Sequence, residues 1–209
     1  MKIQKLQAME NFDCKSRIRE WSRKQIECLS ESEKEELPPE IRESSYLGGP
    51  GATEEQIAAA EARLGVTFPP SYREFLTNSN GLHSPSNNGF YFEFYPTEEV
   101  DWYVLTAPDF VDEIREIFSE PVTDKEYFVY GSEIQYDLKF RPEYLQTALQ
   151  ISYEENGVVF LLNPQIVFSE SGEWEAWCCN FSTAFGIFRY RSFAEMMEQL
   201  IFNAPEFPL

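Results

Sequence analysis

The stretch that decides the fold is GATEEQIAAAEARLGVTFPPSYREFLTNSNG, residues 51–81. Thr53 and Gln56 form a capping-box pattern, in which each side chain satisfies a free backbone N–H at the start of a helix. Gly65 is expected to end this helix in the left-handed conformation that glycine tolerates best. The residues that share its inward stripe are Ile57, Ala60 and Leu64.

A second helix follows after a short extended linker. Pro69 and Pro70 are expected to open it, because proline fits the first turn of a helix. Asn80-Gly81 is expected to end it. Its inward residues are predicted to be Tyr72, Phe75 and Leu76.

The apolar period then changes from helical spacing to two. In FYFEFY, residues 90–95, one face of a strand carries Phe90, Phe92 and Phe94. Asn156-Gly157 predicts a tight hairpin turn, and residues 169–172 predict another. Extended segments are expected at residues 100–105, 127–130, 148–153, 158–163, 165–168 and 173–179.

Two further helices are expected in the second half of the chain. Thr106 is expected to cap the first of them, with Pro108 in its first turn. Its inward residues are predicted to be Phe110, Ile114, Ile117 and Phe118. Ser192 and Glu195 form a capping box for the last helix. The inward residues predicted for that helix are Phe193, Met196, Met197, Leu200 and Ile201.

The N-terminal part of the chain has a different character. Residues 1–36 show helical spacing through Ile18, Trp21, Cys28 and Leu29, and Pro38-Pro39 is expected to stop the helix. Residues 38–51, rich in Pro, Gly and Ser, are expected to form a linker or surface loop. The domain division that follows is a helical extension with its linker, 1–45, and a main domain, 46–209.

Helices on both sides of a run of hairpins predict an α+β fold, with a mixed, largely antiparallel sheet flanked by helices. Its 209 residues are enough to bury a core without disulfides or metals. Cys178 and Cys179 are adjacent, so on a strand they point to opposite faces. Reduced thiols are therefore expected, and with no signal sequence or long apolar run the protein is expected to be cytoplasmic, away from membranes.

Charge is concentrated in the main domain. The chain carries −19 at neutral pH, of which residues 46–209 account for −18. Such a field repels nucleic-acid phosphates and anionic membranes, so neither is an expected partner. The alternative is that the acidity serves only solubility.

Residue patterns for catalysis, cofactor binding or metal binding are not found. His83 is the single histidine and lies in a polar loop, which favours a solvated side chain over a catalytic base. Residues 48–53, GGPGAT, resemble a phosphate-binding loop but continue with Glu54-Glu55 where a P-loop has Lys and Ser or Thr. Acidic pairs are too numerous in this chain to single out a glycosidase dyad. No catalytic residue, cofactor or metal is therefore predicted.

Two segments together resemble the SUKH superfamily. The first runs from Ile57 to Gly81, and the second combines LLNP (161–164), GEWEAW (172–177) and RYRSFAEMM (189–197). The residues that carry the resemblance are Glu61, Leu64, Gly65, Tyr72, Phe75, Leu76, Asn80, Gly81, Asn163, Pro164, Gly172, Trp174, Trp177, Arg189, Tyr190, Ser192 and Phe193. We expect these positions to specify the fold, with Trp174 and Trp177 on opposite faces of one strand.

The resemblance implies a protein that works by binding another protein, without catalysis. Members of that superfamily include immunity proteins against polymorphic toxins and a fungal regulator of cell-wall assembly. An immunity protein that neutralises a toxin domain by stoichiometric binding is the leading hypothesis. A regulatory scaffold, with residues 1–36 recruiting a second partner, is the alternative from another class, and an unrecognised hydrolase or transferase is the third.

The expected binding surface is the acidic stretch 93–137. It contains 13 Asp and Glu residues against Arg115 and Lys125. A basic toxin domain would suit it, because nucleases that grip phosphates are typically cationic. The partner-binding candidates are Tyr95, Glu98, Glu99, Asp101, Trp102, Asp109, Asp112, Glu113 and Glu116. The alternative interpretation is a solvated helix face followed by a polar turn.

Overall fold

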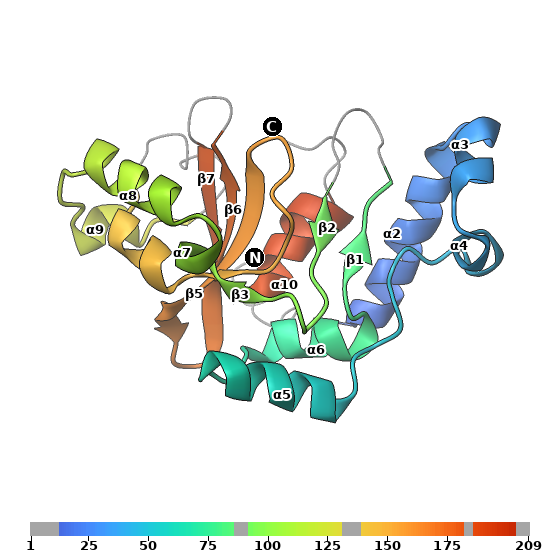
Figure 1. Cartoon of the computed structure of the whole chain (residues 1–209), viewed down its shortest axis with the longest axis horizontal. Coiled ribbons are helices and arrows are strands. Elements are labelled where there is room, and N and C mark those ends of the chain that lie inside the picture. Colours follow the sequence, from blue (N-terminus) through green and yellow to red (C-terminus); the bar gives the residue numbers. More distant parts are fainter. Residues whose placement is uncertain (1–12, 86–91, 131–138, 182–185, 204–209) are drawn as a thin grey trace, which may run out of the picture.

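The computed structural model describes residues 13–85, 92–130, 139–181 and 186–203 (Figure 1). The helices are α2 (Cys14–Cys28), α3 (Glu31–Glu36), α4 (Pro39–Ser44), α5 (Glu54–Leu64), α6 (Pro70–Asn78), α7 (Tyr103–Thr106), α8 (Pro108–Ile117), α9 (Asp124–Tyr127), the 3₁₀-helix η2 (Pro142–Thr147), α10 (Phe193–Met196) and the π-helix η3 (Met197–Phe202). The strands are β1 (Leu82–His83), β2 (Glu93–Phe94), β3 (Asp101–Trp102), β4 (Leu149–Gln150), β5 (Val158–Phe168), β6 (Glu173–Asn180) and β7 (Gly186–Tyr190).

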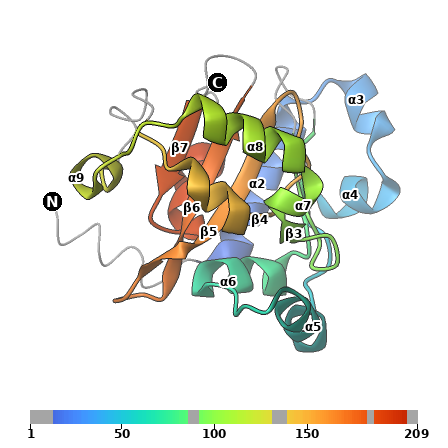
Figure 2. The same ribbon diagram turned by 60° about the vertical axis from the view of Figure 1, so that its left-hand side comes forward.

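A five-stranded sheet in the order β3-β4-β5-β6-β7 is the centre of the molecule, and β1 and β2 form a separate pair. Every one of these strand pairs is antiparallel. The fold is therefore α+β, as the sequence predicts, with helices on both faces of the sheet (Figures 1 and 2).

The two faces of the sheet belong to two apolar layers. On β6, Trp174, Ala176 and Cys178 point into the larger core, which α2, α5, α6, α10 and η3 also line. Trp177 and Cys179 point into the smaller core, beneath α7, α8 and η2. Because adjacent strand residues face opposite ways, β6 is buried along its whole length. The predicted opposition of Trp174 and Trp177 is confirmed.

The capping signals position the helices as expected. The reciprocal hydrogen bonds between Thr53 and Gln56 start α5, and Gly65 ends it with φ 71°. The Ser192 hydroxyl accepts from the Glu195 N–H at the start of α10. The predicted inward residues of α5, α6 and the last helix are all buried. Gly51 permits a close backbone approach, because a Cβ there would collide with the Thr77 carbonyl.

The hairpin predictions also hold. Asn156 and Gly157 both have positive φ, as a tight two-residue turn requires, and lead into β5. The segments 158–163 and 165–168 form one strand, with a register irregularity between Asn163 and Val167. Proline has no N–H to give to the ladder, and Pro164 falls at that irregularity. Phe92 and Phe94 are both buried, and Phe90 lies outside the described residues.

Several predicted elements are wrong at the N-terminal side. The helix ends at Cys28, and Leu29–Ser30 separates it from α3. Cys28, predicted on the inward stripe, is exposed, whereas Leu29 is buried. α3 ends at Glu36, just before Pro38-Pro39 as predicted, and Pro39 then opens α4, because proline suits the first helical position. The predicted linker 38–51 thus contains a short helix.

Other errors fall between residues 100 and 130. Only Asp101–Trp102 of the segment 100–105 is extended, and Tyr103–Thr106 is helical. Residues 127–130 are not a strand, since α9 ends at Tyr127 after a capping box of Thr123 and Glu126. Ala107, not Thr106, is the N-cap residue of α8.

The inward face of α8 also differs from the prediction. The buried residues of α8 are Val111 and Ile114, while Ile117 is exposed. Thr106 is the last residue of α7, and its hydroxyl donates to the Tyr103 carbonyl and to Gln150 Oε1.

Candidate partner-binding surface

The outer side of α8 presents a row of carboxylates. Val111 and Ile114 anchor the helix in the smaller core, and Phe110 contacts Phe181 edge-on at 4.7 Å. With that side buried, the helical repeat turns four acidic side chains to solvent: Asp109, Asp112, Glu113 and Glu116. Within the described residues, the ion pair found on this row joins Asp112 to Arg115 at 3.5 Å on the same helix.

Two exposed apolar side chains lie on α8 and on the helix that precedes it, α7. Leu105 on α7 is 65% exposed and Ile117 on α8 is 52% exposed. Sequence reasoning missed Leu105 and assigned Ile117 to the core. Apolar side chains within a charged rim are the usual composition of a protein-binding surface. We call Leu105, Ile117 and the four α8 carboxylates the α7–α8 surface.

The other candidates lie on the segment 95–102, and the structure gives several of them local roles. Glu98 accepts hydrogen bonds from Gln56 Nε2 at 2.9 Å and Thr97 Oγ1 at 3.0 Å. Hydrogen bonding, first from its own backbone N–H, lowers the pKa of Glu98. Asp101 accepts from the Trp102 N–H, and Trp102 packs partly buried against the larger core. These three residues hold the turn and β3 in place.

Tyr95 and Glu99 instead both contact the exposed Tyr153, and Tyr95 itself is partly buried. Tyr95 contacts Tyr153 edge-on at 4.6 Å, and the Tyr153 hydroxyl donates to Glu99 Oε2. That hydrogen bond to a carboxylate raises the pKa of Tyr153 to about 12. Tyr153 is 40% exposed and was not predicted, because it comes from the distant segment after β4. The segment 95–102 and the α8 row are joined along the chain through α7.

A buried polar network is centred on Glu175 of β6. The fully buried Glu175 accepts hydrogen bonds from Tyr127, Tyr130, Asn163, Trp177 and Arg189, at 2.7–3.0 Å. The Arg189 guanidinium also lies 4.0 Å from the centre of the Tyr127 ring. Asn163, Trp177 and Arg189, which carry the family resemblance, therefore all bond to Glu175, which is not among the residues that carry it.

This network fastens α9 and residues 128–130 to the sheet. A buried carboxylate is stable only when it is paired and fully hydrogen-bonded, and Glu175 meets both conditions. Its donors come from four separate segments of the chain, so their meeting was not visible in the sequence. With Glu175 fully buried, the arrangement positions structure and does not present a reactive group.

The remaining residues that carry the family resemblance, called the signature residues below, have structural roles. Glu61 Oε1 accepts from the Phe68 N–H and from Arg73 Nε, which ties α5 to α6. Asn80 Oδ1 accepts from the Thr97 N–H. All three signature glycines have positive φ: Gly65, Gly81 and Gly172. The signature residues buried in the larger core are Leu64, Tyr72, Phe75, Leu76, Trp174, Tyr190 and Phe193.

The described residues contain no group of three or more His, Cys, Asp or Glu side chains placed to hold a metal ion. His83 is exposed, with Nδ1 3.7 Å from Glu93 Oε2, on the short strand β1. None of the described helices is both long enough and apolar enough to cross a membrane.

The sequence of the chain matches the model of a known protein family. Residues 51–199 match the model described as the SMI1 / KNR4 family (SUKH-1). The chain belongs to this family. The match includes the sheet, the helices α5 and α6, the α7–α8 surface and the Glu175 network, and it begins after α2, α3 and α4. No curated protein matches the sequence of the chain.

Membership in the SMI1 / KNR4 family is consistent with an immunity or a regulatory role exercised through protein partners. The family is generally non-catalytic. The resemblance seen in the sequence is thereby confirmed at the level of family and fold.

Proposed function

We propose that this SUKH-1 chain is an immunity-type protein that binds a cationic toxin domain stoichiometrically and neutralises it without catalysis. The observation that carries the proposal is the α7–α8 surface, where four exposed carboxylates adjoin exposed Leu105 and Ile117. Tyr95, Glu99 and Tyr153 extend the candidate surface. The turn and β3 next to this surface are held in place by Glu98, Asp101 and Trp102.

Electrostatics supports this choice of partner. Like charges three or four residues apart on a helix repel each other, at a cost of a few tenths of a kcal/mol per pair. A cationic partner relieves this repulsion, and its approach is accelerated by long-range attraction. Leu105 and Ile117 supply the apolar contact that surface charges alone lack, since an exposed ion pair contributes only about 0–1 kcal/mol.

The test measures association with the toxin domain encoded nearest to the gene of this protein. Replacing Asp112, Glu113 and Glu116 with Lys is expected to slow association at least tenfold at low ionic strength. The difference is expected to shrink as salt is added, because salt screens steering. Leu105→Ala is expected to act mainly on the dissociation rate, since it removes a short-range contact.

A matched variant controls for net charge. Glu35, Glu36 and Glu43 are exposed on α3 and α4, at the end of the molecule far from α8 (Figure 1). Replacing these three with Lys makes the same change in net charge and is expected to leave association within about twofold. Unchanged association in a folded α8 triple variant would exclude this face from the interface. A toxin that remains active when saturated with the chain would contradict the proposed neutralisation itself.

A further inference from the structure

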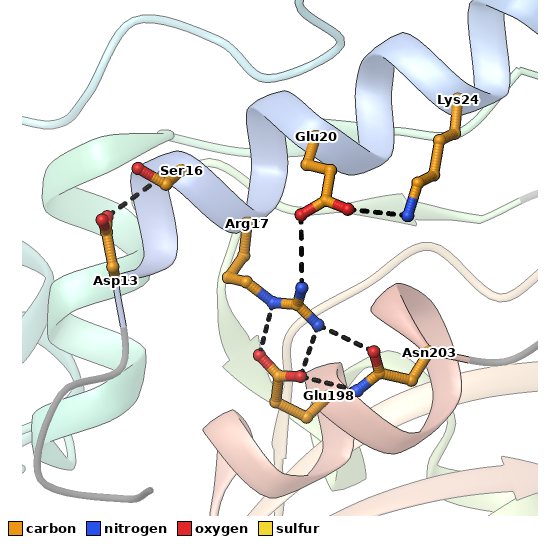
Figure 3. A network of polar contacts seen from close by, with 7 residues as sticks. All are labelled: Asp13, Ser16, Arg17, Glu20, Lys24, Glu198 and Asn203. Carbon is orange, nitrogen blue, oxygen red and sulfur yellow. Dashed lines mark hydrogen bonds and ion pairs between the residues drawn. The ribbon is translucent and has the colours of Figure 1, made fainter.

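The N-terminal helix α2 is held firmly against the domain. It buries Cys14, Ile18 and Trp21 in the larger core. Figure 3 shows Arg17 reaching from α2 to Glu198, which it contacts through Nε at 2.7 Å and Nη2 at 2.6 Å. The same Nη2 donates to Asn203 Oδ1 at 2.9 Å. The side of α2 that faces away from the core is thus presented in a fixed orientation.

The charge of α2 is opposite to that of the rest of the chain. Its 15 residues contain five basic and two acidic side chains, a balance of +3, and the remainder of the chain carries −22. Lys15, Arg19 and Arg23 are exposed and follow one another at four-residue steps, so they form a stripe along the helix. We call these three residues the α2 stripe.

Neighbouring carboxylates neutralise this stripe only in part. Glu20 bonds to Lys24 and Arg17 on the adjacent flank of the helix (Figure 3). Glu27 lies 3.7 Å from Arg23. Within the described part of the chain, the ion pairs formed by α2 do not include Lys15 or Arg19. Repulsion between three like charges in a row weakens a helix. The packing of α2 against the domain offsets this repulsion.

We infer that the α2 stripe is a second interaction surface, which takes an acidic segment of a partner protein. The three cations rise by about 6 Å per step, which matches carboxylates placed at every fourth residue of another helix. A nucleic acid or an anionic membrane would bring many charges near the strongly negative remainder of the chain, which opposes its approach. A short acidic helix touches α2 alone.

The stripe lies far from the acidic surface. α2 and α8 are at opposite ends of the long axis of the molecule (Figure 1). Two partners of opposite charge therefore fit on one chain without competing. The family match begins after α2, so this second surface is additional to the shared domain. The inference does not depend on the toxin proposed for α8.

The test uses a labelled synthetic helical peptide with Glu at every fourth position, titrated into the full chain at low ionic strength. Wild-type protein is expected to bind it, with an affinity that falls as salt is added. Replacing Lys15, Arg19 and Arg23 with Glu is expected to weaken binding at least tenfold. The corresponding triple replacement with Gln, which only removes charge, is expected to lie between the two and guards against a folding defect.

Two comparisons make the result specific. Replacing Arg115, Lys125 and Lys139 with Glu changes net charge equally at the other end of the molecule, and this variant is expected to bind like wild type. A peptide of the same composition with its Glu residues scattered around the helix is expected to bind more weakly. The inference would be overturned if both triple variants lost binding equally, or if the scattered peptide bound as well as the regular one. It would also be overturned if a single-stranded DNA of matched charge bound more tightly than the peptide, or if wild type bound no peptide.

Discussion

At the scale of single residues, Glu175 is where one substitution should cost most. Glu175→Gln keeps the shape of the side chain but leaves the buried Arg189 guanidinium without its carboxylate. Removing one partner of a buried ion pair costs about 3–5 kcal/mol, because the remaining charge stays desolvated. The free energy of unfolding should fall by that amount, which urea unfolding should show as a lower midpoint with an unchanged slope.

Tyr72 provides the control for that substitution. It is as deeply buried as Glu175, but its hydroxyl has no hydrogen-bond partner among the described residues. Tyr72→Phe removes an unsatisfied polar atom, so stability should stay within about 1 kcal/mol of wild type or rise. A loss as large as that of Glu175→Gln would show that burial alone, and not the network, sets the cost.

The contrast also explains why residue-level prediction from sequence succeeded unevenly. The exposed row on α8 follows from spacings of three and four residues within one helix, so Asp109, Asp112 and Glu116 were predictable together. The Glu175 network joins segments separated by 12 to 48 residues along the chain, and no local spacing encodes such contacts. The signature residues Asn163 and Arg189 pointed to it only through the family resemblance.

At the scale of elements, capping chemistry proved a better guide than residue preference. The capping box at Thr53 and the Ser192 cap, whose partner Glu195 bonds to the Arg191 N–H and not back to Ser192, fixed two helix starts, and Asn156-Gly157 fixed a hairpin. The aromatic run 127–130 favours a strand by composition, but the box at Thr123 starts a helix just before it. Local hydrogen bonds satisfy the backbone first, and tertiary contacts then decide which aromatic side chains are buried.

The seating of α2 gives a prediction at this scale. Arg17→Ala removes the partly buried two-point contact with Glu198 and should cost about 1–2 kcal/mol. Backbone amides of α2 should then exchange hydrogen faster than those of β5 and β6. Lys24→Ala is the control, because its pair with Glu20 is exposed to solvent and is expected to contribute little. Uniformly faster exchange in all elements would mean that Arg17 supports the whole fold.

At the scale of the whole molecule, charge and aromatic burial act together at high pH. Burial is the main cause that raises the pKa of Tyr72, Tyr103, Tyr127 and Tyr190 above the ordinary value of 10.0. Nearby carboxylates add to it, with Glu175 beside Tyr127 and Glu154 beside Tyr103. The folded chain therefore holds these protons at a pH where the unfolded chain has lost them.

The sign of the effect follows from that difference in bound protons. Below pH 10 both states are protonated, and the four tyrosines do not make stability depend on pH. Above it the unfolded state binds fewer protons, so stability should fall by up to about 5 kcal/mol per pH unit for four such groups. Alkaline unfolding should be steep, and tyrosinate absorbance should rise together with the loss of the fold. In Tyr72→Phe one titrating group is gone, so the decline should be shallower by about 1.4 kcal/mol per pH unit; an identical slope would show that Tyr72 does not take part.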